Sequence, residues 1–305
     1  MSIYRSTERL QNLGRDLVGS ILREYEPQGL GADAFGLTLV VYPDGAPPEG
    51  FSYSGTRPFY PCSVVKMFWM AACLARIEEG AVTPHAELDR ALHDMIAWSS
   101  NTATNYVIDQ VTGTTGDTLL EGDELAAWVA ARDWANEWLR SLGIPEFQGI
   151  NVCQKNMDDD RYGRERQLVD ALGHNSLTTE ATARLLHEIF DGRTFSAASR
   201  NQMRRLLARR HDPEWVGAHP AAQVRGYLGA GLPADAKLWS KAGWTGWTGD
   251  ARASYRRHDA ARIEAPGLPP LTLVLFTEGK RMSECETALP DIATRALKII
   301  KNEIA

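Results

Sequence analysis

The chain has 305 residues, of which 44% are hydrophobic, and it carries a formal net charge of −6. A chain of this length and apolar content can bury a large core and form two lobes. The acidic balance argues against nucleic acid as a partner, and no apolar stretch is long enough to span a bilayer. The seven histidines lack metal-site spacing, so the sequence predicts neither a metal nor a cofactor.

The first element expected in chain order is an amphipathic helix. It follows Ser6 and Thr7, and its apolar positions recur at helical spacing: Leu10, Leu13, Leu17 and Ile21. Charged residues among positions 1–9 interrupt the apolar core that an export signal requires. We therefore expect a cytoplasmic protein with no membrane partner and with its four cysteines reduced.

Residues 35–42 and 271–276 are rich in β-branched residues and are predicted to be strands. The last helix is expected to begin near Pro290, because proline is tolerated in the first turn of a helix. Strands near both ends of the chain, with helices between them, predict one sheet assembled from distant segments.

The most informative pattern is a serine, Ser63, followed three positions later by Lys66. Positions three apart share a helix face, so the amine can reach the hydroxyl as a base reaches a nucleophile. Residues 64–74 are apolar nearly all round, which predicts a buried helix extending to residues 79–80. Burial would lower the pKa of a lysine toward that of a base. The alternative is a lysine that snorkels from an ordinary core helix.

Two later segments complete the pattern. Residues 95–105 contain Ser99-Ser100-Asn101, and the strand-like run 238–246 contains Lys241-Ala242-Gly243. With residues 63–66, they resemble the S-x-x-K, S-D-N and K-T-G elements of class A β-lactamases and penicillin-binding proteins. Ser100 replaces the aspartate of the second element, and Ala242 replaces the threonine of the third.

The resemblance covers most of the chain and implies its architecture. Residues 175–186 and 197–203 look like the helices that close the helical domain of class A β-lactamases. The implied fold is α+β, an antiparallel sheet flanked by the terminal helices with an inserted all-helical domain. We expect residues 1–60 and 222–305 to form the sheet domain, residues 61–221 to form the helical domain, and the active site to lie at their interface.

The resemblance also implies catalytic roles. Ser63 Oγ would attack a carbonyl, and neutral Lys66 would accept its proton to give an acyl-enzyme. Ser99 would relay a proton to the leaving group, and Lys241 would supply positive charge beside it. Taken singly, the serine suits a helix N-cap and the second lysine suits an edge strand.

Binding roles follow in the same way. Asn101 would hydrogen-bond a substrate amide and the head group of the lysine base. The backbone N–H groups of Ser63 and Trp244 would form the oxyanion hole, with Thr245 as a further binding residue. Arg252, expected on the next strand, would recognise a carboxylate in place of the hydroxyl that the K-T-G threonine supplies elsewhere.

The chain departs from class A β-lactamases where they carry a deacylating glutamate in an E-x-x-L-N element. Here residues 156–167 contain Glu165 between Arg164 and Arg166, a pattern typical of a surface ion pair. Asp160-Arg161-Tyr162 looks like the start of the family's loop. We therefore expect slow release of a β-lactam acyl group, whereas an ester or small amide would turn over.

Two further expectations concern the pocket. Residues 112–139 are longer than the family pattern and are expected to form a wall or lid. Motif adjacency assigns Trp98, Trp244 and Trp247 to the pocket lining, and Trp69 and Trp128 to the core. A narrow aromatic pocket suits a compact, partly apolar acyl group.

The sequence thus predicts an intracellular serine hydrolase that cleaves an amide, ester or lactam bond of a small molecule through an acyl-serine. Two alternatives remain: a true class A β-lactamase, and a binding or sensor protein of the same fold that is acylated without turnover. The oligomeric state is not predicted.

Overall fold

The computed structural model describes residues 3–155 and 163–304 of the chain. Its centre is a six-stranded sheet in the order β2-β1-β6-β5-β4-β3, in which every neighbouring pair is antiparallel. The strands are β1 (Phe35–Val41), β2 (Glu49–Tyr53), β3 (Ala208–Arg209), β4 (Lys237–Thr245), β5 (Arg256–Glu264) and β6 (Leu271–Glu278).

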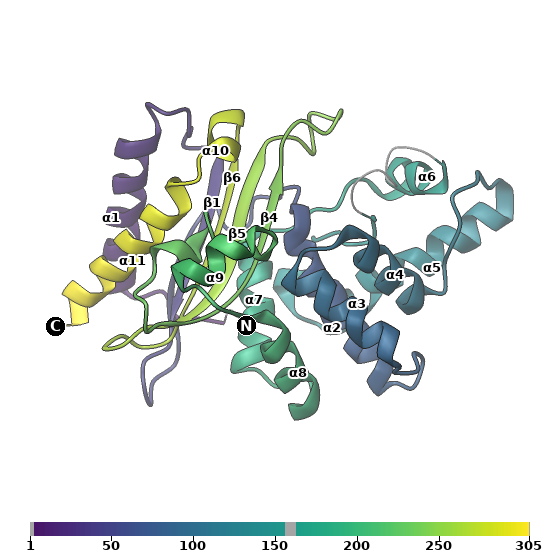
Figure 1. The fold of residues 1–305 in the computed structure, drawn as a ribbon, viewed down its shortest axis with the longest axis horizontal. Helices are drawn as coiled ribbons and strands as arrows, with labels where there is room; N and C mark the ends of the chain where they lie inside the picture. The colour runs from purple at the N-terminus through teal and green to yellow at the C-terminus, as the bar shows by residue number, and fades with distance from the viewer. Residues whose placement is uncertain (1–2, 156–162, 305) are drawn as a thin grey trace.

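The terminal helices cover one face of this sheet. In α1 (Glu8–Tyr25), the predicted positions 10, 13, 17 and 21 are buried, and the helix begins where Thr7 Oγ1 accepts a hydrogen bond from the backbone N–H of Leu10. The last helix, α11 (Ala288–Ile304), begins two residues before Pro290 and packs beside α1. Both belong to one apolar core with the sheet face beneath them, as Figure 1 shows.

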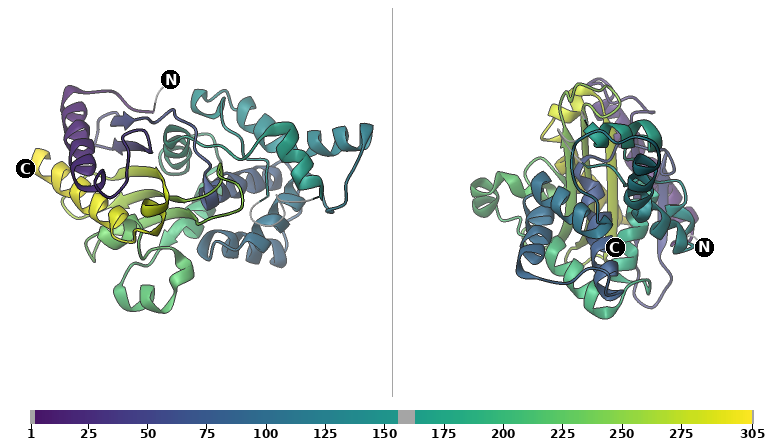
Figure 2. Two further views of the ribbon diagram at one scale, coloured as in Figure 1. Left: turned by 90° about the horizontal axis from the view of Figure 1, so that it is seen from above. Right: turned by 90° about the vertical axis from the view of Figure 1, so that its right-hand side faces the viewer.

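Helices from the middle of the chain form the second lobe. The long helices are α2 (Lys66–Glu78), α3 (Ala86–Ala97), α4 (Asn101–Thr112), α5 (Gly122–Ser141), α6 (Gly163–Leu172), α7 (Thr179–Phe190) and α8 (Ala197–Leu207). The shorter helices of the structure are η1 (Cys62–Val65), η2 (Pro145–Phe147), α9 (Pro213–Ala218), η4 (Pro220–Ala222), η5 (Leu228–Gly231) and α10 (Lys280–Glu284). Of these, η5 packs on α11 and α10 packs on β5 and β6, so both belong to the sheet lobe. Figure 2 shows the helical lobe beside the sheet lobe, with α1 and α11 at the end remote from α5.

The helix α2 is the centre of the second core. Its residues 66–74 are all buried, as its apolar surface predicts. Trp69 is fully buried, as predicted, and its indole N–H donates to Val152 O at 2.8 Å. Because one face of α7 packs on β1, β5 and β6, the helical core is continuous with the second face of the sheet.

The predicted architecture is confirmed, and one boundary differs. Residues 208–209, expected within the helical domain, pair with Leu238 and Trp239 and add the edge strand β3 to the sheet. Two residues give almost no periodic signal, so a strand of this length escapes detection in the sequence. Among the described residues, no helix combines the length and apolarity needed to cross a membrane.

Candidate active site

A cavity of about 510 Å³ opens where β4 meets the start of the helical lobe. Ser63 lines it from the 3₁₀ turn η1, and Asn101 lines it from the start of α4. The other residues around it are Tyr60, Cys62, Arg166, His174, Trp244, Thr245, Thr248, Gly249, Asp250, Ala251 and Ala253.

The backbones of β4 and of the turn η1 approach each other closely at the end of the cavity that contains Ser63. A Cβ atom on Gly243 would lie 2.9 Å from Ser63 N and 2.9 Å from Pro61 O. Only glycine therefore allows β4 to pass so near the turn that carries the serine. The next residue along β4 is Trp244, so two backbone segments that can donate N–H groups converge at Ser63.

Replacing Gly243 with alanine is expected to lower the free energy of unfolding by about 2 kcal/mol, because the neighbouring atoms are backbone and cannot swing away. The same shift would move β4 from Ser63 and slow acylation. Urea unfolding and acylation kinetics measure the two effects. Gly149→Ala is the matched control, because a Cβ there meets nothing within 4 Å. Equal stability of the two variants would contradict the close approach.

Lys66 is completely buried beside the serine that precedes it by one turn. Its Nζ donates to Ser99 O at 2.6 Å and to Asn101 Oδ1 at 2.7 Å, and it lies 3.3 Å from Ser99 Oγ. Burial lowers the pKa of Lys66 to about 7. Two carbonyl-type acceptors use the two N–H bonds of a neutral amine, which leaves a lone pair to accept a proton. Within the described residues, Ser63 Oγ has no hydrogen bond.

Ser99 joins the two lysines. Its Oγ accepts a hydrogen bond from Lys241 Nζ at 3.0 Å, and it lies between that ammonium group and Lys66. The residue has φ 57°, a left-handed conformation that is uncommon outside glycine and concentrates at functional sites. It separates α3 from α4, where Ser100 Oγ caps the new helix by accepting from Ala103 N. Of the two serines, Ser99 therefore contacts the two lysines and Ser100 caps the helix.

Lys241 is buried, and burial, followed by repulsion from Lys66, holds its pKa well below the ordinary value. Its Nζ donates to Gln223 Oε1 at 2.8 Å and to Ala242 O at 2.7 Å. Asp259, fully buried nearby, accepts from two backbone N–H groups, and burial raises its pKa to about 7. Sequence reasoning missed Gln223 and Asp259, because neither lies in a recognisable motif.

The remaining predicted binding residues have mixed outcomes. Trp244 lines the cavity, and its indole N–H donates to Ser283 O at 2.7 Å. Thr245 also lines it, and its hydroxyl donates to Ala253 O at 2.8 Å. The placement of Arg252 on the next strand is wrong. It lies in the β4–β5 loop, is exposed, does not line the cavity and pairs with Asp250 at 3.0 Å.

The pocket aromatics were only partly predicted. Trp98 does not line the cavity but stacks on Trp215 and His219. Trp247 is 63% exposed and lies beside Tyr255. Both lie close to a motif in sequence, yet neither lines the cavity that contains Ser63.

Residues 112–139 do not form the wall or lid that was expected. No described residue between 112 and 139 lines the cavity, and α5 packs against α4 and α6 instead. Trp128 is buried, as predicted, in a small core between these helices. The segment therefore supports the lobe rather than the pocket.

The prediction of a surface ion pair around Glu165 is also wrong. The carboxylate is buried and pairs with Arg132 of α5 at 2.5 Å, and Lys155 N donates to it at 3.4 Å. The flanking arginines bind elsewhere: Arg164 donates to carbonyl groups of residues 115 and 118, and Arg166 pairs with Asp170. A helical register explains this, because α6 buries Glu165 and directs both neighbours, which are only partly buried, to other sides of the helix. The loop start expected at 160–162 lies outside the described residues.

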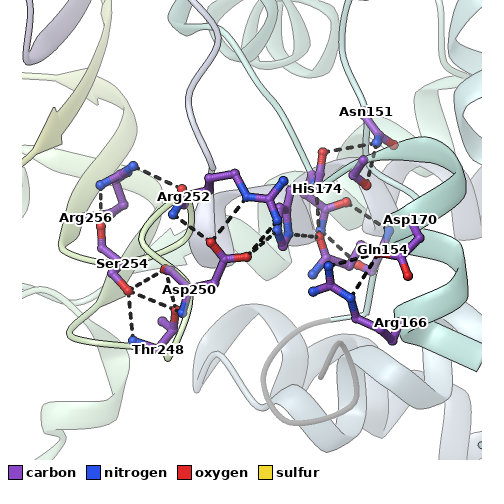
Figure 3. A network of polar contacts seen from close by, with 12 residues as sticks. Asn151, Gln154, Arg166, Asp170, His174, Thr248, Asp250, Arg252, Ser254 and Arg256 are labelled. Atoms are coloured by element: carbon purple, nitrogen blue, oxygen red, sulfur yellow. Dashed lines mark hydrogen bonds and ion pairs between the residues drawn. The ribbon is translucent and has the colours of Figure 1, made fainter. Parts of the chain in front are cut away.

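Five cavity residues with polar side chains were not predicted to line the cavity: Tyr60, Arg166, His174, Thr248 and Asp250. Figure 3 shows four of them in one network of polar contacts, in which His174 lies between Asp250 and Gln154. They come from three separate segments, so only the tertiary structure brings them together.

Comparison with known proteins gives a family. The family described as "Beta-lactamase enzyme family" matches residues 31–300. The carbapenem-hydrolysing β-lactamase KPC of Klebsiella oxytoca is 25% identical over 289 residues, covering 91% of this chain and 90% of that protein.

Solved structures agree on the fold. A β-lactamase from Xanthomonas campestris pv. campestris is similar with a TM-score of 0.63 and 19% identity, covering 94% of this chain and 97% of that chain. The class A β-lactamase of the last common ancestor of Gram-negative bacteria gives a TM-score of 0.61 at 20% identity, covering 92% of this chain and 98% of that chain. The fold is that of class A β-lactamases, and the chain belongs to the β-lactamase enzyme family as a serine β-lactamase-like hydrolase.

Proposed function

We propose that Ser63 is the nucleophile of a hydrolase that opens small lactams, esters or amides through an acyl-serine. The observation that carries the proposal is the pair of buried lysines that share Ser99 Oγ beside the cavity. Burying two lysine side chains at one hydroxyl is costly in a protein interior, and such an arrangement is typical of a catalytic site.

The proposed acylation begins with Lys66 as a neutral amine. Its lone pair accepts the proton of Ser63 Oγ as that oxygen attacks the carbonyl carbon. The backbone N–H groups of Ser63 and Trp244 stabilise the oxyanion that develops. The proton then passes from Lys66 through Ser99 Oγ to the leaving group, a path supported by the 3.3 Å separation of Nζ and Oγ.

Lys241 assists this relay as a positive charge. Its hydrogen bond to Ser99 Oγ orients that hydroxyl so that the Ser99 proton points away from Lys241 and can pass to the leaving group. Gln223 Oε1 and Ala242 O hold the ammonium group in place. We infer a positioning role for Gln223, since it touches neither Ser63 nor the cavity wall.

The release of the acyl group distinguishes this enzyme from an efficient β-lactamase. Glu165 is occupied by Arg132 and does not line the cavity, so we infer that it is not the base for deacylation. A β-lactam acyl group, which retains its leaving group, would then be released slowly, whereas an ester acyl group would be released faster.

Intact-mass measurement tests the proposed function. After exposure to a fluorophosphonate, an ester and a cephalosporin, we expect one adduct per chain on the peptide that contains Ser63. The ester adduct should disappear with turnover, and the cephalosporin adduct should persist. Rapid loss of the cephalosporin adduct would indicate a true β-lactamase, persistence of every adduct would indicate a sensor, and an adduct on another residue would contradict the proposal.

A separate prediction concerns Glu165. Replacing it with glutamine is expected to lower the free energy of unfolding by about 3 kcal/mol, because the buried Arg132 guanidinium loses its carboxylate. The deacylation rate should stay within about twofold. Urea unfolding and the decay of the cephalosporin adduct measure the two quantities. A deacylation rate that falls about a hundredfold would identify Glu165 as the base.

A further inference from the structure

Two side chains from opposite lobes meet in the wall of the cavity. His174 follows α6 in the helical lobe, and Asp250 lies in the β4–β5 loop at residues 246–255. Both line the cavity, and His174 Nε2 lies 2.9 Å from Asp250 Oδ2. This contact, visible at the centre of Figure 3, closes the cavity wall between the lobes. We call it the strap.

Asp250 is held firmly within its own loop. Its carboxylate accepts from the backbone N–H of Arg252 at 2.9 Å and from the guanidinium of the same residue at 3.0 Å. Its carbonyl accepts from Ser254 Oγ at 2.6 Å, and its backbone N–H donates to Thr248 Oγ1 at 3.3 Å. The carboxylate is therefore in position before His174 reaches it.

His174 is held as firmly on the other side. Its Nδ1 lies 3.2 Å from Gln154 Oε1, an oxygen that also accepts from the backbone N–H of Asn175 at 2.9 Å. Gln154 and Asn175 exchange two further hydrogen bonds of 2.9 Å between side chain and backbone. Because both partners are preorganised, opening the strap requires more than the rotation of one surface side chain.

The hydrogen bonds also define the protonation state of the strap. Both ring nitrogens of His174 face oxygen acceptors, Asp250 Oδ2 and Gln154 Oε1. An imidazole that donates from both nitrogens carries two protons and a positive charge. His174 therefore makes both hydrogen bonds, to Asp250 and to Gln154, only when its ring carries two protons.

The surroundings determine when that proton is lost. Burial lowers the pKa of His174 from its ordinary value, Asp250 opposes this effect, and the positive charges of Arg252 and Arg166 add to it. Arg166 extends from α6 and pairs there with Asp170, and the other neighbours, Gln154 and Tyr60, are neutral near pH 7. Raising the pH therefore removes the proton and weakens the strap.

The position of the strap indicates which part of a substrate it meets. The cavity is lined by Ser63, Asn101 and His174 but by neither Ser99 nor Lys241. Its volume therefore extends from Ser63 away from the relay to the leaving group. We propose that the His174–Asp250 strap selects substrates by limiting the size of the acyl group. This inference rests on the proposed function, because it assumes acyl transfer to Ser63.

Acylation by two esters with one leaving group tests the strap. We compare p-nitrophenyl acetate with p-nitrophenyl diphenylacetate in the wild type, His174→Ala, Asp250→Ala and the double variant. Either single substitution is expected to raise the bulky-to-small rate ratio by about tenfold. The double variant should add nothing further, because each single variant already opens the strap. His211→Ala, which removes a half-buried histidine bonded to Ala236 O, should leave the ratio unchanged.

The dependence of this ratio on pH separates a charged strap from a passive wall. In the wild type, the bulky-to-small ratio should rise as the pH is raised toward 6.5 and stay constant above it, because the pKa of His174 is lowered from its ordinary value of 6.5. In Asp250→Ala it should be constant. The titration of Lys66 affects both esters equally and cancels in the ratio. A constant wild-type ratio, unchanged ratios in the single variants, or additive effects in the double variant would overturn the proposal.

A binding measurement distinguishes failure of the strap from failure of the proposed function. This measurement uses the p-nitroanilide of diphenylacetic acid and the Ser63→Ala variant, so that no acyl transfer is required. Adding Asp250→Ala to that variant should raise the equilibrium affinity for this compound about tenfold. An adduct on Ser63 without this gain would overturn the strap alone. A gain without any adduct on Ser63 would support the strap and contradict the proposed nucleophile.

Discussion

Replacing Ser63 with alanine is expected to lower the rate of acylation by about 10⁵-fold or more, the effect typical of removing an acyl-accepting nucleophile. No other cavity-lining group in the described structure can replace it. The thiol of Cys62, its neighbour, is buried, and burial raises its pKa to about 12, so that the reactive thiolate is scarce. Intact mass after fluorophosphonate treatment and the release rate of p-nitrophenol measure the loss.

The control for this experiment is a second serine of the same region. Ser100→Ala removes the cap of α4 and is expected to cost about 1 kcal/mol of stability, while the adduct still forms. If Ser63→Ala retained the adduct, the nucleophile would have to be assigned to another residue. If Ser100→Ala also abolished it, loss of local structure rather than loss of chemistry would explain both results.

Replacing Lys66 with methionine is expected to lower the acylation rate by about 10³-fold, within the range for loss of a general base. Methionine is unbranched and apolar, so it suits the fully buried position of the lysine side chain. Ser63 would remain but would have to lose its proton without help. Acylation kinetics with p-nitrophenyl acetate measure the change, and Lys237→Met, at an exposed lysine paired with Glu264, is the matched control.

The same variant tests the protonation state of the base. Because burial lowers the pKa of Lys66 to about 7, the neutral amine predominates above that pH and becomes scarce below it. The wild-type acylation rate should therefore fall about tenfold for each pH unit below pH 7, and this dependence should be absent in Lys66→Met. A wild-type profile that is flat between about pH 5 and about pH 7 would contradict a neutral lysine base.

Much of the fold could be predicted because its signals are local. The β-branched residues of β1 and β6, the helical spacing of α1 and the apolar surface of α2 each lie within one segment of the chain. Hydrophobic burial acts on such patterns directly, so they predict both the element and its core face. The edge strand β3 escaped prediction because its pairing with β4, rather than its own sequence, makes it a strand.

The candidate site residues follow the same division. The resemblance to class A β-lactamases and penicillin-binding proteins implied roles for Ser63, Lys66, Ser99 and Lys241, and helical spacing by itself supported only the pairing of Ser63 with Lys66. Arg252, Trp98 and Trp247 were misplaced, because neighbours in sequence need not face the same cavity. The inward turn of Glu165 depends on Arg132, which lies 33 positions away in sequence.

By itself, the sequence determined the terminal helices, two strands of one sheet and the buried helix that carries Lys66, because these patterns are local. The antiparallel arrangement of the sheet and the chemistry of an activated serine were implied by the resemblance of three motifs to a known family. Only the tertiary structure decided which residues complete the pocket. Gln223 at Lys241, Arg132 at Glu165 and the strap of His174 and Asp250 are contacts between distant segments. The free energy of such contacts depends on the shared burial and the mutual orientation of two segments, and neither segment encodes these alone.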